Sequence, residues 1–107
     1  MASRHPIQIA RPIVTKYVRV MRARRIRPMS VYLFGSYAHG KPSDDSDIDV
    51  AVVSKDFSGD AIEDGVLLMR CRRNVDLRIE PHPFRPEDFT PDNPWVAEIL
   101  RTGIKIV

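Results

Sequence analysis

The sequence predicts an α/β (α+β) domain in which a small mixed β-sheet carries helices on one face. Two observations predict this fold class. Short apolar runs of strand length alternate with longer stretches in which apolar residues recur every three or four positions, as they do in amphipathic helices. Prolines and polar turn residues separate these runs. A chain of 107 residues is long enough for one modest core and too short for a second, so residues 1–107 are expected to form a single domain.

The composition is typical of a soluble globular protein, with 43% hydrophobic and 29% charged residues. No apolar run approaches the roughly 18–20 residues that a membrane span requires. The N-terminus lacks the apolar region of a signal peptide. Cys71 is the only cysteine, which excludes an internal disulfide and a zinc site built from several thiolates. These observations predict a cytoplasmic protein that does not engage a membrane.

The charge is distributed unevenly along the chain. Residues 1–43 hold nine Lys or Arg and no Asp or Glu, whereas residues 44–107 hold eight basic and fourteen acidic residues. A basic first half can attract a nucleotide, a nucleic acid or an acidic protein surface. The same arginines also fit the solvated face of a helix, and both interpretations stay open at this point.

The first part of the chain predicts an arm followed by an amphipathic helix. Residues 1–6 carry little pattern and are expected to be a flexible arm. The helix is expected to begin at Ile7 or at Pro12, where proline suits the first helical position, and to end before Pro28. Its apolar stripe consists of four residues at spacings of three and four, with Ile13, Tyr17, Val20 and Met21 as members.

The middle of the chain predicts two strands separated by a polar turn. Ser30–Phe34 is an apolar run of strand length, and a short helix is expected over residues 36–39. Residues 41–45 are a polar turn. Residues 47–53 are rich in valine and form the second predicted strand.

The second half predicts a helix and a third strand. The helix begins near Asp60, which stands at capping-box spacing from Glu63. Its expected buried stripe is Ile62, Val66 and Met69. Residues 74–80 alternate strictly between apolar and polar, which is typical of a strand, and Pro81 is expected to stop it.

The C-terminal stretch predicts one more helix and a short strand. Asn93 suits the N-cap of a helix, Pro94 its first position and Gly103 the residue just past its end. Residues 104–107 are expected to add a short edge strand.

A Gly-Ser pair and an Asp-x-Asp pair stand ten residues apart within this pattern. Gly35 and Ser36 directly follow the first strand, and Asp47 and Asp49 open the second. Because strand side chains alternate, the two aspartates share one face about 7 Å apart, where carboxylates can hold divalent cations through oxygen ligands. Gly35 allows close backbone approach, and the free N–H groups of the turn that begins at Ser36 suit phosphate.

This arrangement resembles the nucleotidyltransferase superfamily of the DNA polymerase beta type. It is most similar to the minimal nucleotidyltransferases, whose pattern is Gly-Ser, ten residues and Asp-x-Asp. The resemblance is close from Val31 to Val53 and looser from Val75 to Ile79, and it implies the polymerase-beta-like palm fold. His39 is a departure, since many relatives carry Arg before the glycine.

The resemblance implies Mg²⁺-dependent nucleotidyl transfer from ATP. Asp47, Asp49 and Asp76 would be the catalytic carboxylates and the ligands of two Mg²⁺ ions. Gly35 and Ser36 would hold the β- and γ-phosphates of the nucleoside triphosphate. Two such ions, roughly 4 Å apart, can stabilise the attacking and the leaving oxygens. A hydroxyl acceptor would attack the α-phosphorus and release pyrophosphate.

Asp76 is the carboxylate that the motif itself supports least. If the strands predicted at residues 47–53 and 74–80 are neighbours, about 4.8 Å apart, alternation brings Asp76 onto the face of the Asp-x-Asp pair. Glu80 lies about 13 Å further along by strand rise and is expected to be outside the site.

The resemblance also implies a partner. Minimal family members often act with a helical HEPN protein, as antitoxin to its toxin, and some transfer AMP onto a tyrosine of that toxin. An adenylyltransferase with a protein acceptor is therefore expected.

Two alternatives remain, a non-enzymatic antitoxin subunit and a basic nucleic-acid-binding module. The intact Gly-Ser pair and carboxylates argue against the first alternative. The absence of an aromatic platform or reading-helix motif beside the arginines argues against the second.

Overall fold

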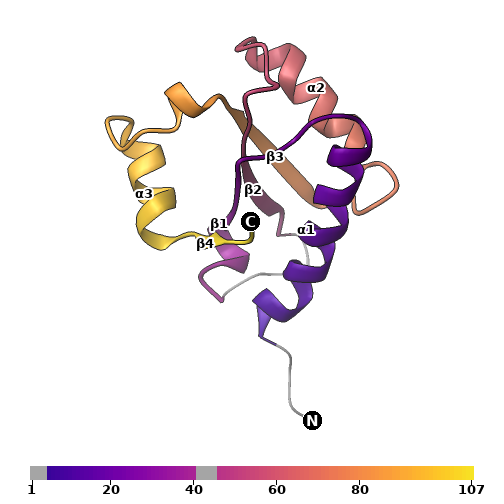
Figure 1. The fold of residues 1–107 in the computed structure, drawn as a ribbon. Helices are drawn as coiled ribbons and strands as arrows, with labels where there is room; N and C mark the ends of the chain where they lie inside the picture. The colour runs from indigo at the N-terminus through magenta and orange to yellow at the C-terminus, as the bar shows by residue number, and fades with distance from the viewer. Residues whose placement is uncertain (1–4, 41–45) are drawn as a thin grey trace.

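A four-stranded mixed sheet forms the centre of the molecule in this computed structural model, which describes residues 5–40 and 46–107 (Figure 1). The strand order is β3-β2-β1-β4. The strands are β1 (Ser30–Phe34), β2 (Ile48–Val53), β3 (Ile79–Phe84) and β4 (Ile104–Lys105). Strand β1 pairs antiparallel with β2 and β4, whereas β2 and β3 run parallel. The predicted mixed sheet is confirmed. The polar turn predicted at residues 41–45 lies outside the described residues.

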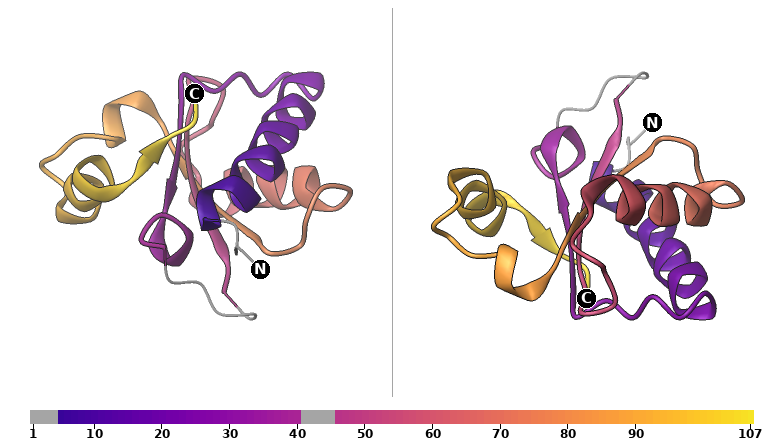
Figure 2. Two further views of the ribbon diagram at one scale, coloured as in Figure 1. Left: turned by 90° about the horizontal axis from the view of Figure 1, so that it is seen from below. Right: turned by 90° about the horizontal axis from the view of Figure 1, so that it is seen from above.

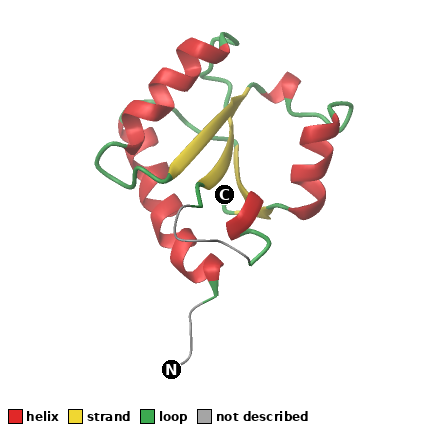
Figure 3. Cartoon of the chain, turned by 180° about the vertical axis from the view of Figure 1, so that it is seen from behind, coloured by secondary structure: helices red, strands yellow, loops and turns green. Residues whose placement is uncertain are grey.

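The helices lie on both sides of this sheet. They are α1 (Pro6–Ala23), α2 (Ala61–Arg72) and α3 (Pro94–Thr102), with short 3₁₀ turns η1 (Gly35–Tyr37) and η2 (Pro86–Asp88). Figure 2 shows α1 and α2 on one face and α3 on the other, whereas the sequence predicted all helices on one face. The same division is visible from behind in Figure 3. None of the helices in the described part of the chain is long and apolar enough to cross a membrane.

The main core fills the space between the sheet and the pair α1 and α2. Alternate residues of β1 and β2 point into it, so that Val31, Leu33, Ile48, Val50 and Val52 are fully buried. Tyr17 of α1 is also fully buried, and its hydroxyl donates a 2.7 Å hydrogen bond to the carbonyl oxygen of Leu68 in α2. Burial raises the pKa of this phenol, which keeps it neutral and ties the two helices together.

Helix α1 begins at Pro6, one residue before the earlier of the two predicted starts, because His5 caps it. The His5 ring accepts a 3.2 Å hydrogen bond from the Ile7 N–H, and the Gln8 side chain accepts one of 2.9 Å from the His5 N–H. This capping box places Pro12 inside the helix and not at its first position, so that prediction was wrong. Of the predicted arm, residues 1–4 lie outside the described residues, and Pro6 is helical.

Helix α2 presents the opposite face to the core from the one predicted. Ile62 is 81% exposed, whereas Asp64, Leu68 and Cys71 are buried. The predicted set and the observed buried set have the same spacing along the helix. The observed set is offset by two positions, which corresponds to a rotation of about 200° around the helix axis. Asp64 fixes the rotation by accepting three hydrogen bonds. The Ser58 N–H donates one of 2.9 Å, the Ser58 hydroxyl one of 3.0 Å and the Gly59 N–H one of 3.0 Å.

Strand β3 is shifted along the chain from its predicted position at residues 74–80. It spans Ile79–Phe84 and continues through Pro81, which was expected to stop it, and Pro83. The Ile48 N–H donates to the Arg78 carbonyl, and the Ser54 N–H donates to that of Phe84. Even-numbered residues therefore bond to β2, and the prolines occupy odd positions that face the free edge, where no N–H is needed.

The C-terminal predictions are confirmed. The Asn93 side chain accepts a 2.9 Å hydrogen bond from the Trp95 N–H, so that it caps α3 as expected. Strand β4 follows Gly103 and pairs with the outer edge of β1.

The orientation of α2 can be tested with two apolar truncations on opposite faces. Leu68→Ala should lower the free energy of unfolding by about 2–5 kcal/mol, because it leaves a cavity under Tyr17. Ile62→Ala should change it by less than about 0.5 kcal/mol. Urea unfolding curves measure both values. Equal losses, or a larger loss at Ile62, would contradict the observed rotation of the helix.

Candidate functional site

Gly35 brings the end of β1 against the carboxylate of Asp49. The antiparallel register pairs Phe34 with Asp49, and the chain turns immediately afterwards with a φ of 73° at Gly35. A Cβ atom built at Gly35 would overlap the Asp49 Oδ2 atom, closer than real Cβ atoms approach any neighbour. Glycine is therefore required here for both its backbone angle and the space it leaves.

Ser36 follows Gly35 in the η1 turn. The Ala38 and His39 N–H groups both donate 3.1 Å bonds to the Gly35 carbonyl, which closes the turn. Tyr37 is buried and packs in the core, which anchors the turn. The η1 turn thus begins against Asp49, at Gly35, as a phosphate-binding turn beside a metal ligand would require.

The parallel pairing of β2 with β3 brings two further groups to Asp49. Asp49 pairs with Glu80, and His82 lies two residues along β3, so its side chain points to the same face as that of Glu80. One ligand atom from each of Asp49, Glu80 and His82 lies within 4.8 Å of the other two. The His82 Nε2 atom is 3.4 Å from the Asp49 Oδ1 atom.

Asp47 completes the acidic part of the site from the residue before β2. Asp47 is exposed, and its carboxyl group lies near enough to that of Glu80 to share a proton with it. Sharing a proton with Asp47 raises the pKa of Glu80, helped by partial burial and by the negative charges of Asp47 and Asp49. Glu80 therefore stands in a group of three carboxyl groups whose negative charges repel one another.

Asp76 has a different environment from the one predicted. It precedes β3, and its carboxylate forms an ion pair with Arg78, with 2.7 Å between Nη2 and Oδ2. The Arg78 guanidinium lowers the pKa of Asp76, and its Nη1 atom donates a 3.2 Å hydrogen bond to the Tyr37 hydroxyl. Asp76 is not a member of the group formed by Asp49, Glu80 and His82. It supports Arg78 and, through Tyr37, the η1 turn.

Glu80 and His82 were not predicted as site residues because the third strand was expected too early in the chain. The strict alternation of residues 74–80 favoured a strand ending before Pro81. The sequence does hold one signal for the later strand: Pro81 and Pro83 stand two positions apart, a spacing that an edge strand tolerates.

An aromatic cluster borders the site on the side of α3. The His82 ring centroid lies 5.2 Å from those of Phe34 and Trp95, at interplanar angles of 53° and 89°. Phe84 and Phe89 continue the cluster, with 5.1 Å between their ring centroids. These contacts fix the orientation of the imidazole beside Asp49.

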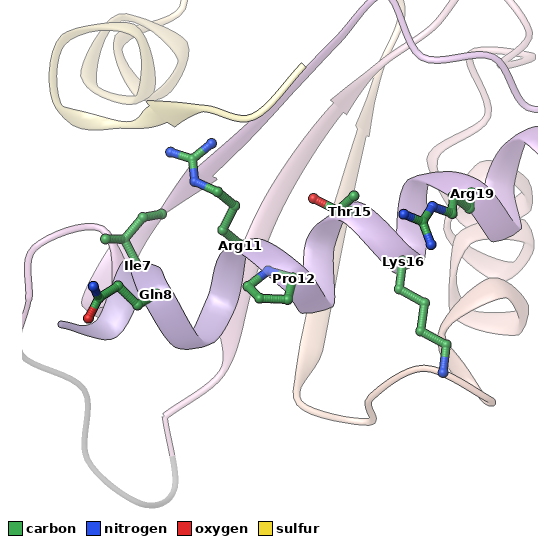
Figure 4. Close-up of a pocket in the computed structure, with 7 residues that line it drawn as sticks. All are labelled: Ile7, Gln8, Arg11, Pro12, Thr15, Lys16 and Arg19. Carbon is green, nitrogen blue, oxygen red and sulfur yellow. The ribbon is translucent and has the colours of Figure 1, made fainter. Parts of the chain in front are cut away.

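A surface groove of about 790 Å³ lies elsewhere, along α1 (Figure 4). Its seven lining residues are Ile7, Gln8, Arg11, Pro12, Thr15, Lys16 and Arg19. Figure 4 shows the side chains of Arg11 and Lys16 pointing in different directions, so they do not converge on one ligand. The groove contains none of the predicted site residues, and the carboxylate cluster remains the better candidate for chemistry.

A family model described as polymerase beta nucleotidyltransferase matches residues 19–89. This match covers most of the chain, including the η1 turn and all the clustered carboxylates. The chain belongs to this nucleotidyltransferase family. The predicted resemblance is thereby confirmed, although no curated protein matches the chain closely enough to extend the comparison.

Two solved structures share the nucleotidyltransferase fold. One is the toxin–antitoxin complex MntA–HpeT in a doubly substituted form, with a TM-score of 0.62 at 19% identity over 87% of this chain and 71% of the other. The second is a Sulfolobus solfataricus protein assigned to the nucleotidyltransferases, with a TM-score of 0.58 at 20% identity over 97% and 87% of the two chains. At these identities the likeness shows the fold alone.

The carboxylate cluster fits the divalent cations that the family implies. Asp49 and Glu80, with Asp47 beside Glu80, offer the oxygen ligands that Mg²⁺ prefers. The negative charges of its neighbours help to raise the pKa of Glu80, and a bound cation would offset this charge excess.

Replacement of Glu80 tests this charge excess without any activity measurement. A raised native pKa gives stability that is fully present below the ordinary glutamate pKa and is lost as the pH rises through the raised value. Glu80→Gln keeps a donor toward Asp47 at every pH, so the melting temperature at pH 7 in EDTA should rise. Differential scanning calorimetry measures it, with the exposed Glu98→Gln as control. A melting temperature below that of the wild type would contradict the charge excess.

Proposed function

We propose that this nucleotidyltransferase transfers AMP from ATP, with Mg²⁺, to a hydroxyl group of a protein partner. One observation supports this most: the turn at Gly35 and Ser36 lies against Asp49 while the β2–β3 register brings Glu80 to the same carboxylate. The turn proposed to bind phosphate is therefore adjacent to the carboxylates proposed to bind the cations. Nucleotidyl transfer requires both at one place, because the triphosphate must be held while its charge is offset.

The proposed roles follow from these positions. Gly35 and Ser36 hold the β- and γ-phosphates, and Asp47, Asp49 and Glu80 hold the cations. Bound cations supply charge compensation at the attacking and leaving oxygens. The acceptor hydroxyl attacks the α-phosphorus, the bond to the β-phosphate oxygen breaks, and pyrophosphate leaves. A carboxylate of the cluster accepts the proton of the hydroxyl. Glu80 thereby takes the role that the sequence assigned to Asp76.

The proposed acceptor is a tyrosine of a HEPN-type toxin, for which the protein acts as antitoxin in the cytoplasm. The structural likeness to MntA, a member of a toxin–antitoxin pair, supports this partner class. That complex carries two Asp-to-Glu substitutions two positions apart, the spacing of Asp47 and Asp49 here. The exposed apolar residues Ile62 and Val66 on α2 offer a surface for a protein partner away from the carboxylates.

Transfer can be tested by incubating the protein with the product of the adjacent gene, Mg²⁺ and each nucleoside triphosphate. Intact-mass spectrometry of both proteins should show one added AMP on the partner when ATP is the nucleotide, and no added mass with the other nucleotides. Added mass from another nucleotide would show that ATP is not the substrate. Binding of the partner without any added mass would favour the non-enzymatic antitoxin.

A pair of variants distinguishes the two candidates for the third carboxylate. Glu80→Gln should lower the rate of transfer by more than about 100-fold, because it removes a charge from the cation site. Asp76→Asn should lower it by less than about tenfold, since its amide oxygen still accepts the Arg78 N–H. Initial rates at matched Mg²⁺ concentration measure both. A larger loss of rate in Asp76→Asn than in Glu80→Gln would show that Asp76, and not Glu80, is the third carboxylate of the site.

Ser36 tests the phosphate-binding turn. Ser36→Ala should weaken ATP binding by about 1.5–3 kcal/mol, the range for a hydrogen bond to a charged group. Isothermal titration calorimetry with Mg²⁺ measures the change, and Thr15→Ala removes a hydroxyl from α1 as the control. Equal ATP affinity of Ser36→Ala and wild type would reject the role of this hydroxyl.

A further inference from the structure

We propose that His82 is a metal ligand and that Asp49, Glu80 and His82 bind a divalent transition metal, Mn²⁺ being the example, more tightly than Mg²⁺. This proposal rests on the proposed function for the identity of the site. It adds the class of cation that Asp49, Glu80 and His82 select. Cation binding at these three residues is measurable whether or not the protein transfers a nucleotide.

The distances between the three side chains suit one ion. Two ligand atoms at roughly 2.0–2.2 Å from a common ion are about 3 Å apart when adjacent and at most about 4.4 Å apart when opposite. The 3.4 Å separation of His82 Nε2 from Asp49 Oδ1 is close to the adjacent value. The whole group lies within 4.8 Å, so closure on an ion needs movements of a few tenths of an ångström.

The backbone and the aromatic cluster hold the imidazole in place for this role. The residue that pairs with His82 across the sheet is Ala51, whose small side chain leaves the ring room beside Asp49. Phe34 and Trp95 contact the ring at 5.2 Å between centroids, and the His82 side chain is only 23% exposed. A ligand that is already oriented loses little rotational freedom when it binds an ion.

The mixed donor set determines which cation is favoured. Mg²⁺ prefers oxygen ligands and retains its water, whereas divalent transition metals accept an imidazole nitrogen, Mn²⁺ the most weakly of the series and zinc, copper, iron and nickel more strongly. A site with one imidazole and two carboxylates therefore discriminates against Mg²⁺. Asp47 interacts with Glu80 and is not a member of this group, so a second cation held by Asp47 and Glu80 would meet oxygen ligands from these two side chains.

The metal preference can be measured by electron paramagnetic resonance with Mn²⁺ alone, in the absence of nucleotide and partner. Titration of the free Mn²⁺ signal gives its affinity, and competition with Mg²⁺ gives the preference, which should exceed about tenfold. His82→Ala should weaken Mn²⁺ binding by about 10–100-fold and Mg²⁺ binding much less. His5→Asn, which keeps a capping side chain on α1, is the matched control and should bind as the wild type does.

Pulsed measurements on the same samples identify the ligand directly. Bound Mn²⁺ should show coupling to a ¹⁴N nucleus in the wild type and in His5→Asn, and none in His82→Ala. Wild-type Mn²⁺ without nitrogen coupling would overturn the inference, even if the His82→Ala variant failed to fold. Unchanged Mn²⁺ affinity in a folded His82→Ala protein would overturn it as well. Nucleotidyl transfer without nitrogen coupling would support the proposed function and reject His82 as a ligand. Nitrogen coupling without transfer would support the metal site and reject the proposed function.

Discussion

The parallel pairing of β2 with β3 is the constraint on which the site depends. In its register Asp49 faces Glu80, so two carboxylates that are 31 positions apart in the sequence meet on one face of the sheet. A shift of one residue would turn Glu80 toward the core and bring Pro81 opposite Asp49. The bonds from Ile48 to the Arg78 carbonyl and from Ser54 to the Phe84 carbonyl hold the register at both ends of the strand.

The antiparallel pairing of β1 with β2 supplies the other half of the site. It positions the turn that follows Phe34 over Asp49, where only a glycine fits. The acidic neighbours raise the pKa of Glu80, so the cluster is expected to cost stability in the metal-free protein above that pKa. Functional sites commonly carry such perturbed pKa values, and here the strands that hold the cluster are fixed by the core beneath β1 and β2.

The sequence predicted those features that depend on local residues. Ser30–Phe34 and the Gly35-Ser36 turn followed from an apolar run and its ending, and Asn93 identified the start of α3. The rotation of α2 did not follow, because Asp64 is buried by hydrogen bonds to a loop, which an apolar pattern cannot show. Glu80 and His82 did not follow either, since the register of a parallel pair is set by contacts distant in sequence.

The location of bound Mn²⁺ in crystals tests the central claim most directly. Crystals of the protein soaked with Mn²⁺ and a non-hydrolysable ATP analogue should give an anomalous peak within about 2.5 Å of carboxylate oxygens of both Asp49 and Glu80. The triphosphate should lie against the turn at Gly35 and Ser36. An ion bound to Asp76 with Glu80 directed away from it would contradict the account, because the β2–β3 register would then not build the site.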